Sequence, residues 1–186
     1  LYGNDYDGTF IPPLSQSTMI KRIVSFISVS SKEAENDRFR KRKELKGYSG
    51  TKKLPFREFY ATDDDSSISD CLFYYFSSIQ HYFPLLWKYD TKSKPTNVLQ
   101  STVGFEVLMK ILKDVLSIDS NMEFKKNAFD KYVNKFADLP LHDTDQFPMT
   151  TRGKKILYYS IFIKVFPDDA SIEEKKRELE SLHNAD

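Results

Sequence analysis

The chain has 186 residues, of which 40% are hydrophobic, and a formal net charge of +1. The balanced charge excludes a protein that binds polyanions with its whole surface, and the single cysteine, Cys71, excludes an internal disulfide. The sequence has no apolar run of about 18 residues, which excludes a membrane span. These totals predict one domain, residues 1–186, in the reducing cytoplasm. Because the chain starts at Leu1 rather than at Met, we expect it to be a piece of a longer protein.

The N-terminal segment predicts a lead-in followed by a helix. Residues 1–14 are rich in Gly, Asp and Pro, which favours an extended conformation. Ser15 or Ser17 is in position to cap a helix whose apolar residues recur at helical spacing. We expect this helix to end near Ser30.

Residues 31–53 change character, because apolar side chains nearly vanish and cations accumulate. We expect a basic, flexible insertion that consists of a solvated helix over residues 32–46 and a mobile loop after it. Its cations are Arg38, Arg40, Lys41, Arg42, Lys43, Lys46, Lys52 and Lys53. Between positions 38 and 53 only Glu44 offsets this positive charge.

This basic stretch is the candidate nucleic-acid-binding site. Lysine and arginine side chains neutralise phosphates and give an affinity that depends on salt but not on base sequence. Phe39 and Tyr48 lie within the stretch, where their rings can stack on bases. We expect double-stranded DNA as the partner, or else the missing N-terminal part or another protein, and no membrane. The alternative interpretation is a solvated, charged face that binds nothing.

An aromatic helix comes next. The carboxylates of residues 63–65 precede it, where they complement the helix dipole, and apolar residues then recur at spacings of three and four from Ile68 to Phe83. Pro84 starts a new short helix or kinks this one. The aromatic stripe consists of Phe73, Tyr74, Phe76, Tyr82, Phe83 and Trp87. We interpret it as core or as a contact with a domain outside the chain, with a docking surface for another protein as the alternative.

The second half of the chain predicts further helices. Residues 88–97 form a polar connector, after which Thr102 caps an aliphatic helix. Ser120 and Glu123 have the spacing of a capping box, which predicts a helix that runs to residue 136.

Residues 156–166 have two interpretations. Their β-branched and aromatic side chains suit a strand, whereas their length and a cap at Thr150 or Thr151 suit a buried helix. We favour the helix because no partner strand is visible, and a short strand is the alternative. Ser171 and Glu174 form a second capping-box pattern before a charged final helix.

The residue patterns predict no catalytic, metal or cofactor site. Cys71 and His81 lie on one predicted helix, about 15 Å apart along its axis, which is too far to share a metal ion. His142 followed by Asp143 is similar to a pair found in metal-dependent phosphohydrolases, but that chemistry requires a second, distant His and Asp. The glycines form no phosphate-binding loop.

The order of the segments resembles a known family. Residues 11–15 (Ile-Pro-Pro-Leu-Ser) precede the first helix, residues 75–79 (Tyr-Phe-Ser-Ser-Ile) lie in the aromatic helix, and residues 101–105 (Ser-Thr-Val-Gly-Phe) start the aliphatic one. Over about residues 9–116 this resembles the C-terminal helical half of the DGQHR-domain proteins, which include regulators of DNA phosphorothioate modification. The resemblance implies a ParB-like nuclease fold upstream. The naming motif is absent, because residues 7–10 read Asp-Gly-Thr-Phe, so no motif residue can be assigned.

The residues predict an all-α fold, a single compact bundle of roughly six helices. Together with the resemblance they predict a non-enzymatic module of a DNA-modification or phage-defence protein, which binds DNA or a partner through the basic stretch and uses no cofactor. The alternatives are an assembly module that docks through its aromatic surface and, more remotely, a metal-dependent hydrolase.

Overall fold

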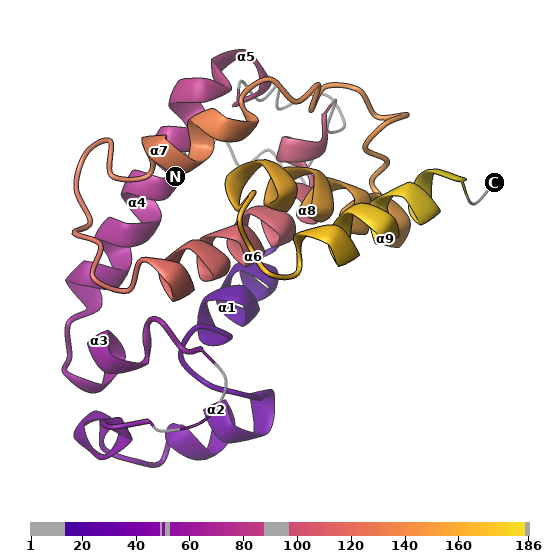
Figure 1. Cartoon of the computed structure of the whole chain (residues 1–186). Coiled ribbons are helices and arrows are strands. Elements are labelled where there is room, and N and C mark those ends of the chain that lie inside the picture. The colour runs from indigo at the N-terminus through magenta and orange to yellow at the C-terminus, as the bar shows by residue number, and fades with distance from the viewer. Residues whose placement is uncertain (1–13, 49, 51–52, 88–96, 185–186) are drawn as a thin grey trace, which may run out of the picture.

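The computed structural model describes residues 14–48, 50, 53–87 and 97–184. Within these ranges the chain forms helices and no β-strand, so the predicted all-α class is confirmed. The predictions made for residues 1–13 and 88–96 lie outside the described residues. Figure 1 shows the helices arranged around α6 (Thr102–Ile118), with the N-terminal helices at one end and α9 (Ile172–Asn184) beside α8 (Thr151–Val165).

Many of the other helices are short. The α-helices are α1 (Gln16–Val24), α2 (Ser31–Asp37), α3 (Arg57–Ala61), α4 (Asp65–Tyr82), α5 (Pro84–Trp87) and α7 (Asp130–Val133), and the 3-10 helices are η1 (Arg42–Leu45), η2 (Val98–Gln100) and η3 (Asn134–Phe136). A helix of one turn produces no hydrophobic period, which is why the sequence predicts only about six. Among the described helices, none is both long enough and apolar enough to cross a membrane.

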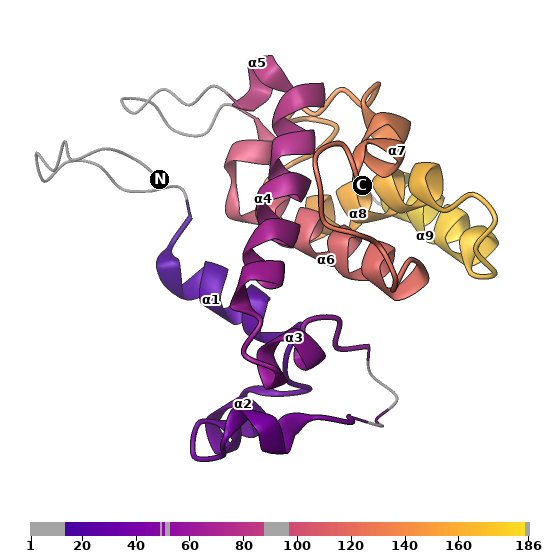
Figure 2. The same cartoon turned by 90° about the vertical axis from the view of Figure 1, so that its left-hand side faces the viewer.

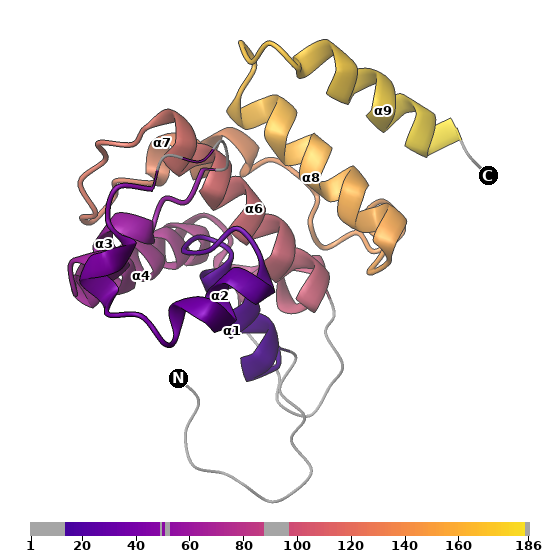
Figure 3. The same ribbon diagram turned by 90° about the horizontal axis from the view of Figure 1, so that it is seen from below.

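Helix α6 is the centre of the hydrophobic core. Its buried residues are Gly104, Val107, Leu108, Met109, Ile111, Leu112, Val115 and Leu116. Figure 3 shows α8 beside α6 and α9 beside α8, so that α8 is the middle layer of the three. Helix α4 contacts α6 through Tyr75, whose hydroxyl donates to the Leu108 carbonyl oxygen at 2.9 Å, and through Phe76, which stacks on Phe105. A helix enclosed by several neighbours has to be apolar around most of its circumference, as the α6 sequence is.

Three helix starts agree with the predicted caps. Ser15 caps α1, and Thr150 caps α8; each side chain accepts a hydrogen bond from a backbone N–H in the first turn. Asp64 caps α4 in the same way, so this carboxylate serves the helix end as predicted. The predicted cap at Thr102 is wrong by one residue, because Ser101 is the residue whose hydroxyl caps α6.

The predicted helix over residues 120–136 is wrong. Residues 119–129 form turns and irregular chain without a helix, Asn127 has a φ of 65°, and helical structure is limited to α7 and η3. The reason lies in Phe124 and Phe129, whose rings stack with centroids 6.4 Å apart. Five residues along a helix correspond to a rotation of about 140° from the starting direction, so a helix would point these rings apart. The turns place both rings together in the core instead.

Residues 156–165 are helical and Phe166 follows as the C-cap, so the alternative of a short strand is wrong. They lie in α8, which begins at Thr151 and passes close to an earlier loop at Gly153. A Cβ atom built on Gly153 would lie 1.8 Å from the Pro148 carbonyl oxygen, and one built on Gly104 would lie 2.1 Å from the Val98 carbonyl oxygen. Both helices therefore rely on glycine for close approach to the preceding backbone.

We expect Gly104→Ala to destabilise the protein by about 2 kcal/mol, because backbone atoms must move to admit the methyl group. Helix propensity alone gives the opposite sign, a gain of about 1 kcal/mol for alanine over glycine. Urea denaturation measures the difference, with Asp70→Ala at an exposed position of α4 as the control. A stabilised Gly104→Ala protein would contradict the close approach of α6 to η2.

Glu106 joins three helices in a partly buried ion-pair network. Its carboxylate on α6 accepts hydrogen bonds from Arg22 on α1 and from Lys154 on α8. Burial acts to raise the pKa of Glu106, but the hydrogen bonds from Lys154 and Arg22 and their positive charges outweigh it, so the pKa lies below its usual value of 4.5. The charged form of Glu106 therefore stabilises the folded state.

We expect Glu106→Gln to lower the free energy of unfolding by about 1 kcal/mol at neutral pH, because half-exposed partners limit the effect. A carboxyl whose folded pKa is depressed contributes stability above its unfolded pKa of 4.5 and loses it as the pH falls through the folded value. The gap between the two proteins should therefore close in acid. Thermal denaturation from pH 7 to pH 3 measures it, and a gap that widens in acid would contradict this account.

Candidate nucleic-acid interface

The basic stretch forms a small lobe at one end of the molecule. We define the basic lobe as residues 31–48, which contain α2, η1 and the turn between them. Figures 1 and 2 both show it beyond α3, at the foot of α4 and away from α8 and α9. The predicted continuous helix over residues 32–46 is wrong, because α2 ends at Asp37 and η1 begins at Arg42. The break is explained by a buried arginine outside the lobe, Arg57.

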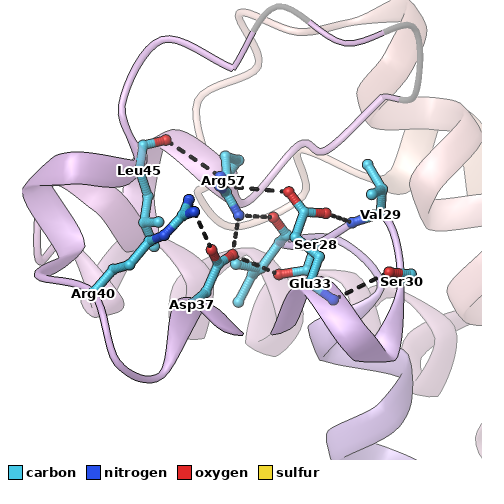
Figure 4. A network of polar contacts seen from close by, with 9 residues as sticks. Ser28, Val29, Ser30, Glu33, Asp37, Arg40, Leu45 and Arg57 are labelled. Carbon is cyan, nitrogen blue, oxygen red and sulfur yellow. Dashed lines mark hydrogen bonds and ion pairs between the residues drawn. The ribbon is translucent and has the colours of Figure 1, made fainter. Parts of the chain in front are cut away.

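Arg57 of α3 holds the basic lobe to the rest of the protein through the Arg57 clasp, which Figure 4 shows. Its guanidinium donates to Asp37 Oδ2 at 2.6 Å, to the Ile27 carbonyl oxygen at 3.1 Å and to the Leu45 carbonyl oxygen at 3.2 Å. Glu33 Oε1 lies 3.8 Å from the same group. The side chains of Arg57 and Asp37 are 8% and 6% exposed, so this ion pair is buried. The clasp connects the turn after α1, α2 and η1 at a single point.

Asp37 is only half satisfied by the clasp. Its Oδ2 binds Arg57 and also accepts from the Ser28 hydroxyl at 3.3 Å. Its Oδ1 is buried and has no hydrogen-bond partner among the described residues, although Arg40 lies 3.9 Å away. The Arg40 side chain is 59% exposed, so one predicted site residue is held loosely near the clasp while its charge stays accessible.

Arg42 is a predicted site residue that serves the fold instead. Its guanidinium donates to both carboxylate oxygens of Asp65, at 2.8 and 2.9 Å, and lies 3.3 Å from Asp63. It also lies over the Tyr60 ring, 4.2 Å from the centroid. The hydrogen bond with Asp65 raises the pKa of Arg42 above its usual value, so the guanidinium stays charged. The carboxylates before α4 therefore anchor η1 as well as the start of the helix.

Most other cations of the basic stretch do not take part in holding the fold together. The exposed side chains that make no ion pair within the described part of the chain are Arg38, Lys41, Lys43, Lys46 and Lys53. Glu44, the one acidic residue among them, is exposed as well. Lys52 lies outside the described residues. The structure thus brings most of the predicted binding residues to the solvent, on a lobe whose base is fixed.

The aromatic residues of the basic stretch are used differently from one another. Phe39 is 87% exposed. Tyr48 is half-buried and faces the Arg57 guanidinium, 5.8 Å from its ring centroid. Of the two predicted stacking residues, only Phe39 presents a free ring.

A groove of about 420 Å³ lies between α1 and α2, beside the basic lobe. Its lining includes the apolar side chains of Ile20 and Val24 on α1 and reaches Arg38 on the lobe. Ile20 is 52% exposed, so part of this apolar surface faces solvent. The groove gives the cationic surface an apolar border on the side of α1.

The other candidate residues are placed in structural roles. Asp143 Oδ1 accepts the backbone N–H groups of Asp145 and Gln146 and so stabilises a turn next to the exposed His142. Cys71 is buried in α4. Among the described residues, no three His, Cys, Asp or Glu side chains are placed to hold one metal ion.

The aromatic stripe mostly faces inward. Phe76 stacks on Phe105 and Phe83 stacks on Phe136, while Tyr74, Tyr82 and Trp87 are partly buried against the core. Phe73 is the exposed member of the stripe, at 65%. The interpretation of the stripe as core therefore holds for most of its rings.

Sequence reasoning missed a cluster of titratable groups between α6 and α8. The Tyr158 hydroxyl donates to Asp114 at 2.9 Å, and the Lys110 ammonium lies 3.4 Å from the Tyr158 ring centroid. Burial raises the pKa of Asp114 against the opposing hydrogen bond from Tyr158, and burial lowers the pKa of Lys110. Such groups also occur at active sites, but here they bind one another across two helices. No local sequence motif predicts this cluster, because Asp114 and Tyr158 are 44 residues apart.

Comparison with known proteins gives no relative for this chain. No family model, no curated protein and no solved structure matches it. The resemblance to the DGQHR-domain proteins is therefore a prediction that these comparisons leave untested.

We expect Arg57→Met to destabilise the protein by about 3 kcal/mol, because it leaves the Asp37 carboxylate buried without its partner. Lys155→Met, at an exposed position of α8, is the matched control. Urea denaturation measures the global effect. Hydrogen exchange should show faster exchange in residues 28–45 than in α6, and unchanged protection of those amides would contradict the role of the clasp.

Proposed function

We propose that this chain is a non-enzymatic helical module that binds duplex DNA through the basic lobe. The observation that carries the proposal is the set of exposed cations on the lobe that form no ion pair with any residue the structure describes. Residues 38–46 carry six cations and one acidic residue, Glu44, and the other acidic residues of the lobe, Glu33, Glu35 and Asp37, lie on α2. Such a surface attracts the closely spaced phosphates of DNA and releases counterions on binding.

The use made of Arg42 and Arg57 supports the same proposal. These two arginines are neutralised by carboxylates, and they anchor η1 and the base of the lobe. The remaining cations therefore project from a surface whose backbone is held, which lowers the entropy cost of binding. Lysine and arginine contacts to phosphates carry no sequence information, so the expected binding is independent of base sequence.

The wider biological setting is proposed from the sequence resemblance alone. A DNA-binding helical module fits a DNA-modification or phage-defence protein of the DGQHR type. The alternative, a module that docks on another protein through an aromatic surface, has less support, because most rings of the aromatic stripe lie in or against the core.

We expect Lys43→Glu combined with Lys46→Glu to weaken duplex binding at least tenfold and to reduce the slope of log K against log salt by about two, one for each phosphate that the variant no longer neutralises. Fluorescence anisotropy with a labelled duplex at several salt concentrations measures both quantities. Both positions are exposed and make no described ion pair, so the fold should be unaffected.

The charge-matched control is Lys126→Glu combined with Lys155→Glu, at exposed positions outside the lobe. It changes the net charge by the same amount and should retain most of the affinity and the full salt slope. Equal losses in the two double variants would show that only net charge matters. That result, or a lack of duplex binding by the unaltered protein at low salt, would refute the proposal.

A further inference from the structure

Phe39 is the most exposed large hydrophobic side chain in the described part of the chain, at 87%. It lies in the turn between α2 and η1, with Arg38 before it and Arg40 after it. A phenyl ring in water loses the favourable burial that most phenylalanines have. An apolar ring between two cations is thus a combination that a ligand can use, because phosphates and an apolar surface lie close together in nucleic acids.

The backbone that carries Phe39 is hydrogen-bonded to the end of α2. The N–H groups of Phe39 and Arg40 donate to the carbonyl oxygens of Asn36 and Asp37, at 3.2 and 3.1 Å. The Asp37 side chain is in turn held by Arg57 in the buried clasp. The ring therefore projects from a fixed turn rather than from a loose loop, which lowers the entropy cost of inserting it into a partner.

The number of free rings indicates the kind of nucleic acid. Proteins that bind single strands present several rings for successive bases. Here Tyr48 faces Arg57 and Tyr60 lies under Arg42, so Phe39 is the free ring among the described aromatic residues of this end. One apolar side chain beside phosphate-binding cations is the arrangement that wedges into a duplex. A membrane surface would require a broader apolar face.

We infer that Phe39 inserts between adjacent base pairs of duplex DNA from the minor groove and kinks the duplex, while Arg38 and Arg40 contact the flanking phosphates. This inference rests on the proposed DNA binding by the basic lobe. It adds that the preferred substrate is duplex DNA that bends easily, such as sequences with TA or CA steps, because unstacking is least costly there.

The test uses a duplex of about 30 base pairs with a fluorophore at each end, so that energy transfer reports bending and anisotropy reports affinity. Phe39→Ala should weaken binding roughly tenfold and abolish the bend, with the salt slope unchanged, because the ring contributes stacking and not charge. Phe39→Leu should retain most of the bend, since leucine also serves as a wedge. Phe73→Ala removes another exposed ring, on α4, and should change neither readout.

The outcomes separate the two proposals. If Phe39→Ala binds and bends the duplex as the unaltered protein does, the inference is overturned and DNA binding by the lobe stands. If the unaltered protein binds no duplex, the proposed function fails as well. Tighter binding to single-stranded DNA that depends on Phe39 overturns the duplex assignment, and so does Phe39-dependent binding to vesicles of phosphatidylserine and phosphatidylcholine. Circular dichroism of each variant establishes that the fold is retained.

Discussion

The buried guanidinium of Arg57 is the constraint on which the position of the basic lobe depends. An arginine removed from water must be surrounded by acceptors, since an unpaired buried charge is very unfavourable. Arg57 finds them in Asp37, in the Ile27 and Leu45 carbonyl groups and, more distantly, in Glu33. These acceptors come from the turn after α1, from α2 and from η1. Satisfying one side chain therefore fixes the relative positions of three segments, of which α2 and η1 have few apolar residues of their own.

The charges of the basic stretch have separate uses as a result. Within the stretch Arg42 is paired with carboxylates and acts within the fold, as the neighbouring Arg57 does, whereas the other described cations of the stretch face solvent. A segment made only of solvated lysines and arginines would have little reason to adopt one structure. Here the paired arginines hold the segment in place, and the unpaired cations remain accessible. Because paired arginines fix the backbone, the unpaired cations can form a binding surface of defined shape even though the lobe has few buried apolar side chains.

The rest of the molecule acts as a scaffold for that lobe. Helix α6 is enclosed by α4 and α8, and Glu106 on α6 ties α1 and α8 to it. Since α1 leads directly into the lobe, this network relates the position of the lobe to the main core. The cluster of Asp114, Tyr158 and Lys110 adds a second polar connection between α6 and α8. The resemblance to the DGQHR-domain proteins gives this scaffold a proposed setting, which the experiments on DNA address.

The sequence by itself determined the all-α class, the helix starts near Ser15, Asp64 and Thr150 to within a residue or two, and the identity of the basic stretch. These features are local, because a cap or a hydrophobic period depends on residues within one or two turns. Only the tertiary structure decided that Phe124 and Phe129 stack across a turn instead of lying on one helix. It also decided that Arg42 forms ion pairs with Asp63 and Asp65, while Phe39 stays exposed. Arg42 finds its partners more than 20 residues away, and the rings of Phe124 and Phe129 also contact Phe59 and Tyr75, more than 50 residues away. Local periodicity carries no information about such contacts.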